Sequence, residues 1–177
     1  AEYRFTYAKL LVDHLHPDAI LSHDDWGSKT SLFMSPEIWR EYFKEHYRRI
    51  YGYMKDHGVI VIHHADSYCE PIVEDMAEIG IDIWQGVLPS NDIPAIQKKL
   101  QGRMVLMGGI DAAVVDRADS TEEEIRAEVR RACESYGPGG HFIPCLTYGL
   151  KDSGIYPNVD ATIEDEIDRY NQQNAKE

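Results

Sequence analysis

The sequence predicts an α/β protein built on a parallel sheet, and three observations support this fold class. Five short apolar runs alternate with longer amphipathic segments along the chain. The 177 residues are 43% hydrophobic and 28% charged, which suits one folded domain over residues 1–177 and disfavours disorder. No apolar run approaches the roughly 20 residues that a membrane span requires.

The five apolar runs are the predicted strands. Apart from Asp82, each run is apolar at consecutive positions, which is typical of strands buried on both faces of a parallel sheet. We therefore expect both faces of the sheet to be covered. The predicted strands are Ala19–Leu21, Val59–Ile62, Ile81–Trp84, Met104–Met107 and Phe142–Pro144.

Amphipathic segments between these runs predict helices. Apolar residues recur at three- and four-residue steps over Glu37–His57, which predicts one long helix. Ser35 and Pro36 suit its start, and Gly58 suits its end. Further helices are expected at the amphipathic opening Ala1–Leu15, at Glu70–Glu78, at Ile93–Gln101, after a capping box formed by Ser120 and Glu123, and at Asp160–Gln172.

Alternating strands and helices leave two architectures, a doubly wound sheet or a (β/α) barrel. The dinucleotide and P-loop glycine signatures are absent, and the run Gly137–Gly140 precedes a strand, so it is interpreted as a turn. A TIM (β/α)8 barrel is therefore favoured. Such a barrel needs about 250 residues. We accordingly expect only its C-terminal five β/α units, an N-terminus at Ala1 that is not native, and open sheet edges that favour a homodimer.

The charge and the cysteine content limit which binding partners and which cellular compartment are expected. The chain carries 31 Asp and Glu against 18 Lys and Arg, a net charge of −13, so its field repels nucleic acid and anionic membranes. Cys69, Cys133 and Cys145 are odd in number and form no C-x-x-C pair, which favours a reducing compartment. Ala1–Leu15 does not resemble a signal or transit peptide. A cytoplasmic protein is expected.

Polar side chains follow the strands at their carboxyl ends, where both architectures place function. Imidazole, carboxylate, thiol and phenol groups therefore converge on one rim of the sheet, and such a set binds metals or transfers protons. The rim residues are His23, Asp24, Asp25 and Trp26 after the first strand, His63, His64 and Asp66 after the second, Gln85 after the third, Gly108, Gly109 and Asp111 after the fourth, and Cys145, Thr147 and Tyr148 after the last.

Several of these residues have a purely structural alternative. His63 and His64 are adjacent in a strand and face opposite sides, so only one of them faces a barrel interior, and the other packs against helices. Asp24 and Asp25 are residues that commonly cap turns. Cys145 is small enough to be an inert buried residue.

Several separated motifs resemble the uroporphyrinogen decarboxylase superfamily. The resemblance covers nearly the whole chain, and it implies a (β/α)8 barrel of that type and an enzyme. The superfamily contains porphyrinogen decarboxylases and cobalamin-linked methyltransferases, and the methyltransferase-like members are the closer match. The motifs are Asp24–Ser28, Leu32–Glu37, Pro71–Ile72 after a strand that ends in histidine, Gly108–Asp111, Glu122–Val129 and Gly139–Ile143.

The methyltransferase branch implies methyl transfer between a corrinoid protein and a thiol or similar acceptor. In that branch zinc is held by a His-x-Cys pair and a later Cys. The match places the histidine at His64, puts Asp66 at the position of the first cysteine, and puts Tyr148 near the second, with Cys145 three residues earlier. The resemblance thus implies zinc at His64 and Asp66, completed by Cys145 or by a second histidine, because a carboxylate is an acceptable zinc ligand. It also implies catalytic roles for His64, Asp66, Tyr148 and Asp25. Substrate contacts are expected from His23, Trp26, Gln85, Gly109 and Asp111.

Two alternatives stay open. The decarboxylase branch implies removal of CO₂ from a tetrapyrrole without a cofactor, and its polycarboxylate substrate calls for arginines at the rim. Most arginines of this chain fall on predicted helices, which disfavours that reading. The other alternative is a ligand-binding member without catalysis, because the His-x-Cys pattern is broken by Asp66.

Overall fold

The computed structural model describes residues 1–147 and 154–174. Its five strands form one parallel sheet in the order β1-β2-β3-β4-β5, so each strand pairs with the next one along the chain. This order is the one that consecutive units of a (β/α) barrel produce. The strands are β1 (Ala19–His23), β2 (Ile60–His64), β3 (Ile83–Val87), β4 (Val105–Ile110) and β5 (Phe142–Leu146). Every predicted strand is confirmed, and each one ends at a later residue than predicted.

Helices connect the strands, and those predicted are present, while the short helix α6 was not predicted. The long helix predicted over Glu37–His57 contains a π-helical segment, Arg40–Lys44, between α2 and α3. The capping box before α7 uses Thr121 and Glu124, one residue later than predicted. The helices are α1 (Glu2–Leu15), α2 (Pro36–Trp39), α3 (Glu45–Asp56), α4 (Val73–Glu78), α5 (Ile93–Leu100), α6 (Ala112–Val115), α7 (Glu122–Tyr136) and α8 (Val159–Asn174).

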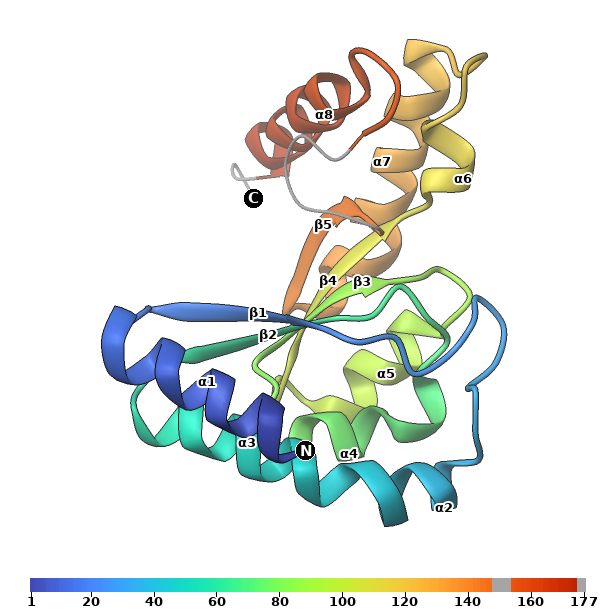
Figure 1. Ribbon diagram of the computed structural model, residues 1–177. Coiled ribbons are helices and arrows are strands. Elements are labelled where there is room, and N and C mark those ends of the chain that lie inside the picture. Colours follow the sequence, from blue (N-terminus) through green and yellow to red (C-terminus); the bar gives the residue numbers. More distant parts are fainter. Residues whose placement is uncertain (148–153, 175–177) are drawn as a thin grey trace.

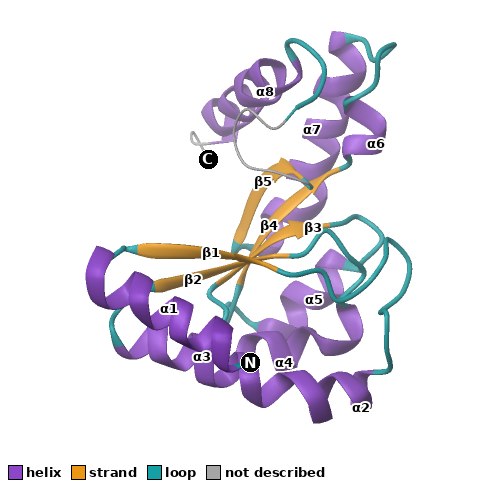
Figure 2. Cartoon of the chain, viewed as in Figure 1, coloured by secondary structure: helices purple, strands orange, loops and turns teal. Residues whose placement is uncertain are grey.

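One face of the sheet packs against helices. Figure 1 shows α1, α3, α4 and α5 on one side of the strands and α7 beside β4 and β5, and Figure 2 shows the same arrangement by element type. Val61, Trp84 and Leu106 point to this side and are buried. The burial of such side chains is the main source of stability in this layer.

The other face of the sheet is partly open. Leu21 and Ile60 are 46% exposed and Ile143 is 41% exposed, although all three lie within strands. The register across the five strands places them on the side opposite Val61, because side chains alternate along a strand. The prediction that the strands are buried on both faces is therefore wrong for β1, β2 and β5. A continuous apolar run does not reveal whether a second layer covers it.

One position of the sheet requires glycine for a steric reason. Gly108 in β4 has a φ of +149°, and a Cβ placed there would lie 2.7 Å from the backbone N and O of Val87. Any larger residue would push β3 and β4 apart at the rim. In the part of the chain that the structure describes, no helix is long and apolar enough to cross a membrane.

Candidate functional site

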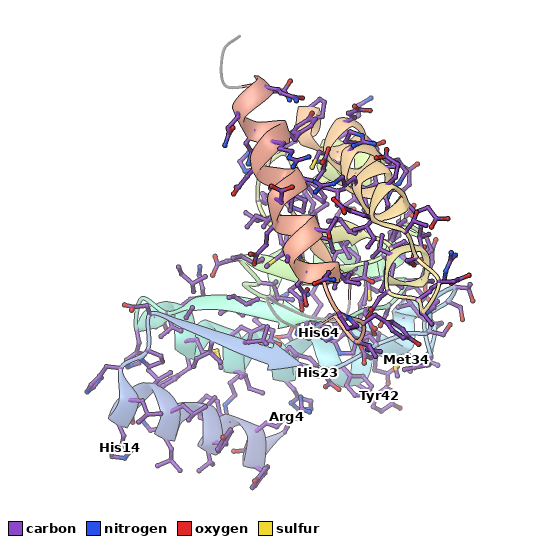
Figure 3. The ribbon with its side chains drawn as sticks, turned by 90° about the horizontal axis from the view of Figure 1, so that it is seen from above. Arg4, His14, His23, Met34, Tyr42 and His64 are labelled. Atoms are coloured by element: carbon purple, nitrogen blue, oxygen red, sulfur yellow. The ribbon has the colours of Figure 1, made fainter. Side chains whose placement is uncertain are left out.

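Three neighbouring strands bring polar side chains together at their carboxyl ends. The parallel register pairs His23 of β1 with His64 of β2, and His64 with Gln85 of β3. These three residues lie on the open face of the sheet, opposite the helices. Figure 3 shows His23 and His64 close together at the end of β1. Residues more than 60 positions apart in sequence thus form one rim.

His64 is buried and held in one orientation. Its Nδ1 forms a hydrogen bond with Oε1 of Gln85. An amide oxygen only accepts, so Nδ1 carries the hydrogen, and Nε2 keeps its lone pair. In that tautomer the other ring nitrogen, Nε2, is the one suited to bind a metal or accept a proton.

His23 and Asp25 complete a cluster around His64. The rings of His23 and His64 are 4.4 Å apart between centroids, and Nε2 of His23 is 3.4 Å from Oδ2 of Asp25. Oδ1 of Asp25 accepts hydrogen bonds from the amide of Asp66 at 3.2 Å and from the hydroxyl of Ser67 at 3.3 Å. One ligand atom from each of His23, Asp25 and His64 lies within 4.8 Å of the other two. Two imidazoles and a carboxylate are zinc ligands.

His63 lies on the other side of the same strand and has a packing role. Its Nε2 donates to the carbonyl of Asp24 at 3.1 Å, and its Nδ1 accepts from the hydroxyl of Tyr51 at 2.7 Å. Burial lowers the pKa of His63 to about 3, so the ring is neutral at physiological pH. The prediction that one histidine of the pair faces inward and the other packs against helices is confirmed.

Two predicted substrate residues are packing residues in the structure. Trp26 is buried, stacks on His63 at 4.1 Å between ring centroids and packs against Trp39. Gly109 faces the helix layer, where an added Cβ would lie 2.8 Å from the ring of Phe142. Neither lies at the open rim, because the strand and loop directions turn both toward the helices.

Asp111 and Asp66 line a separate hollow of the rim. Asp111 also caps α6, because its Oδ1 accepts from the amide of Ala113 at 2.9 Å. Both aspartates border a cavity of about 390 Å³ together with Lys29. Burial and then the charge of Asp25 raise the pKa of Asp66 above its ordinary value.

The metal set that the resemblance implies is not assembled over residues 1–147 and 154–174. His64 clusters with His23 and Asp25, and neither Asp66 nor Cys145 joins that group. Sγ of Cys145 is 4.0 Å from Nε2 of Gln85, so this amide lies between the thiol and His64. Burial raises the pKa of Cys145 to about 12, which keeps it a thiol near neutral pH. Tyr148 lies outside the described residues.

Sequence reasoning missed one residue that supports the cluster and did not anticipate a contact of another. Ser67, which holds Asp25, is buried three positions beyond His64, and its place on the same rim was the available signal. Gln85 was expected to contact substrate; the structure adds that its side chain also orients His64. Pairing across strands, which is a tertiary property, decides both roles.

A parallel sheet in sequence order, with its polar cluster at the carboxyl ends of the strands, defines an α/β protein of the (β/α)-barrel class. Within that class, residues 6–163 match the family described as uroporphyrinogen decarboxylase (URO-D). The chain belongs to the uroporphyrinogen decarboxylase family, which confirms the predicted superfamily.

Two relatives show how much of such proteins the chain represents. It is 27% identical over 160 residues to a uroporphyrinogen decarboxylase of Thioalkalivibrio sulfidiphilus (strain HL-EbGR7), covering 84% of this chain and 41% of that protein. A solved methyltransferase from Methanosarcina mazei shares its fold with a TM-score of 0.69 at 22% identity, covering 96% of this chain and 47% of that one. The chain thus spans about half the length of these relatives. The predicted fold class, five β/α units of a URO-D-type barrel, is confirmed.

Proposed function

We propose that this chain is part of a methyltransferase of the uroporphyrinogen decarboxylase family, which moves a methyl group between a corrinoid protein and a thiol or similar small acceptor. The observation that carries the proposal is the oriented imidazole of His64 beside His23 and Asp25. A donor set of this kind suits a metal-assisted reaction. A decarboxylase without a cofactor has no need of it.

The residues present fit zinc, the metal that the methyltransferase branch implies. His64 and Asp25 would hold it, because each keeps one donor atom directed into the cluster. Zinc bound at this rim would lower the pKa of an acceptor thiol and so favour the thiolate. Gln85 fixes the ring of His64, and the neighbouring hollow lined by Asp66 would receive the rest of the acceptor.

Charge at the rim disfavours the decarboxylase alternative. The 390 Å³ cavity is lined by Lys29 but also by Asp66, Asp111 and Asp116, so its field repels a substrate that carries many carboxylates. Arginines that could offset this field are engaged on helices. For example, Arg126 and Arg130 both bind Glu166, which lies on α8.

Methyl transfer by the full-length protein tests the proposal. The protein is incubated with a methylated corrinoid protein and a panel of small thiols, and the methylated thiol is measured by mass spectrometry. We expect product with the wild type and at least about 100-fold less with His64→Gln, as the loss of a metal ligand implies. Release of CO₂ from uroporphyrinogen, with no methylated thiol, would instead support the decarboxylase. Turnover in neither assay would support the ligand-binding alternative.

The compartment and partner follow from the same proposal. The cysteines Cys69, Cys133 and Cys145 are all free, which suits the reducing cytoplasm that the sequence predicts. The proposed macromolecular partner is the corrinoid protein that carries the methyl group. A pull-down with the methylated and unmethylated corrinoid protein would measure that contact.

A further inference from the structure

We infer that His23, Asp25 and His64 form a divalent-metal site for zinc, in place of the set His64, Asp66 and Cys145 that the family resemblance implies. The inference deepens the proposed function and takes its chemical context from it. Its support is the placement of the side chains, so its test is independent of methyl transfer.

The three side chains converge from two adjacent strand ends. Strand register places His23 directly beside His64, and their rings lie edge to face at 4.4 Å. One donor atom from each of the three residues lies within 4.8 Å of the others. Ligands of tetrahedral zinc, at about 2.0–2.2 Å from the ion, lie about 3.3–3.5 Å apart. Nε2 of His23 and Oδ2 of Asp25, 3.4 Å apart, already have this spacing, and the side chain of His23 is 66% exposed, so it has room to rotate toward His64.

Outer contacts already hold two of the three ligands. Gln85 binds Nδ1 of His64 and leaves Nε2 for an ion. The amide of Asp66 and the hydroxyl of Ser67 bind Oδ1 of Asp25 and leave Oδ2, which is 3.4 Å from Nε2 of His23. Metal sites characteristically have such second contacts, because they fix the tautomer and orientation of each ligand.

The set implied by the resemblance would require this arrangement to be broken. Cys145 lies beyond Gln85 as seen from His64, and its Sγ donates to the carbonyl of Leu146 at 3.2 Å. Asp66 supports Asp25 through its backbone amide, while its side chain lines the neighbouring cavity with Lys29. Both residues therefore lie next to the site without entering it.

The donor set also indicates the kind of site. Three protein ligands leave at least one position of a tetrahedral ion free, which is the arrangement of catalytic rather than structural zinc. His23 is exposed, so the ion would be reachable from the open rim. Two nitrogens and one oxygen, without sulfur, suit zinc and cobalt alike, and cobalt then serves as a visible probe.

Metal binding by the full-length protein tests the inference. The protein is treated with a chelator and titrated with Co²⁺ by absorption and with Zn²⁺ by calorimetry. We expect a cobalt spectrum of nitrogen and oxygen ligation without a thiolate-to-cobalt charge-transfer band. His23→Ala and Asp25→Asn should each weaken binding at least about 100-fold, and Gln85→Ala about 10- to 100-fold. Because His23 is exposed, its variant should keep the fold, which circular dichroism verifies.

Matched variants of the competing set decide the outcome. Cys145→Ser and Asp66→Asn should leave the cobalt spectrum and the zinc affinity unchanged. A charge-transfer band that disappears in Cys145→Ser would overturn the inference, as would wild-type affinity in His23→Ala. Tight zinc binding without methyl transfer would instead reject the proposed function and leave the metal site standing. Methyl transfer with unchanged zinc affinity in Asp25→Asn would reject the site alone.

Discussion

The two faces of the sheet are built from the same five strands but meet different surroundings. On the helix-covered face, Val61 and His63 of β2 are fully buried, while Ile60 on the open face of that strand is 46% exposed. The polar cluster of His23, Asp25 and His64 also lies on the open face. One strand therefore provides packing on one side and the candidate site on the other.

The adjacent histidines of β2 show this difference within two residues. Both ring nitrogens of His63 are used by Tyr51 and the carbonyl of Asp24, so the ring has no nitrogen left for a ligand. His64 uses only Nδ1 in its bond to Gln85, and its Nε2 stays available. The neighbours of a histidine, rather than its presence in a motif, decide which role it takes.

The largest expected effect comes from the helix-covered face. Trp84 is fully buried, and its Nε1 donates to the carbonyl of Ala65 at 2.9 Å. Trp84→Ala should lower the free energy of unfolding by about 3–5 kcal/mol, because it leaves a large cavity between sheet and helices. Urea denaturation measures the change. A loss below about 1 kcal/mol would mean that this face is less well packed than the structure shows.

The histidine pair should separate stability from metal binding. His63→Gln should cost about 1–3 kcal/mol, because buried polar partners such as the Tyr51 hydroxyl lose good geometry, while zinc affinity is retained. His64→Gln should instead weaken zinc binding and change the free energy of unfolding less. Urea denaturation and zinc calorimetry on both variants check this. Loss of zinc binding in a folded His63→Gln protein would contradict the division between the two faces.

A smaller effect is expected where α8 packs on α7, outside the sheet. Burial would raise the pKa of Glu166, but hydrogen bonds from Arg130 and Arg126 outweigh it and hold the pKa below 4.5. Since the folded pKa is the lower one, this stabilisation is present above about pH 4.5 and is lost as the pH falls through the folded value.

Thermal unfolding between pH 7 and pH 3 measures this effect, with Glu166→Gln as the matched control. The wild type should be more stable than the variant near pH 7, and the difference should shrink on acidification. A difference that stays constant with pH would show that the two arginines contribute no charge-dependent stability at this position.

The smallest effect is expected on the open face. Ile60→Thr should change the free energy of unfolding by less than about 0.5 kcal/mol, because half of this side chain already meets solvent. Val61→Thr, one residue away, should cost about 1–3 kcal/mol, since it buries a hydroxyl against the helices. Equal losses in parallel urea titrations would show that a further layer covers the open face.

Much of the fold could be predicted because its signals are local. Each strand is a short apolar run, and periodic apolar residues marked the helices that pack on them. Helix α6 was missed because its four residues are too few to show a period, although Asp111 supplies its cap. The capping box shifted from Ser120 to Thr121 because both residues precede a glutamate by three positions.

The site was less predictable, because its members are selected by contacts between strands. The rim residues followed from strand ends, and His64 was among them. Ser67 and Gln85 acquired their roles only through bonds to Asp25 and His64, which lie 42 and 21 positions away in sequence. Trp26 shares the loop with Asp25, but its ring turns toward Trp39.

Local patterns in the sequence were enough to indicate the strands, the longer helices and their order, the family, and the opposite orientation of His63 and His64. These follow from periodicity and motif order, which depend only on neighbouring residues. Tertiary structure decided which face of the sheet is covered, which of the two histidines is available, and which residues gather around it. The physical reason is that burial and hydrogen-bond partners come from other strands, and strand register sets those distances rather than spacing along the chain.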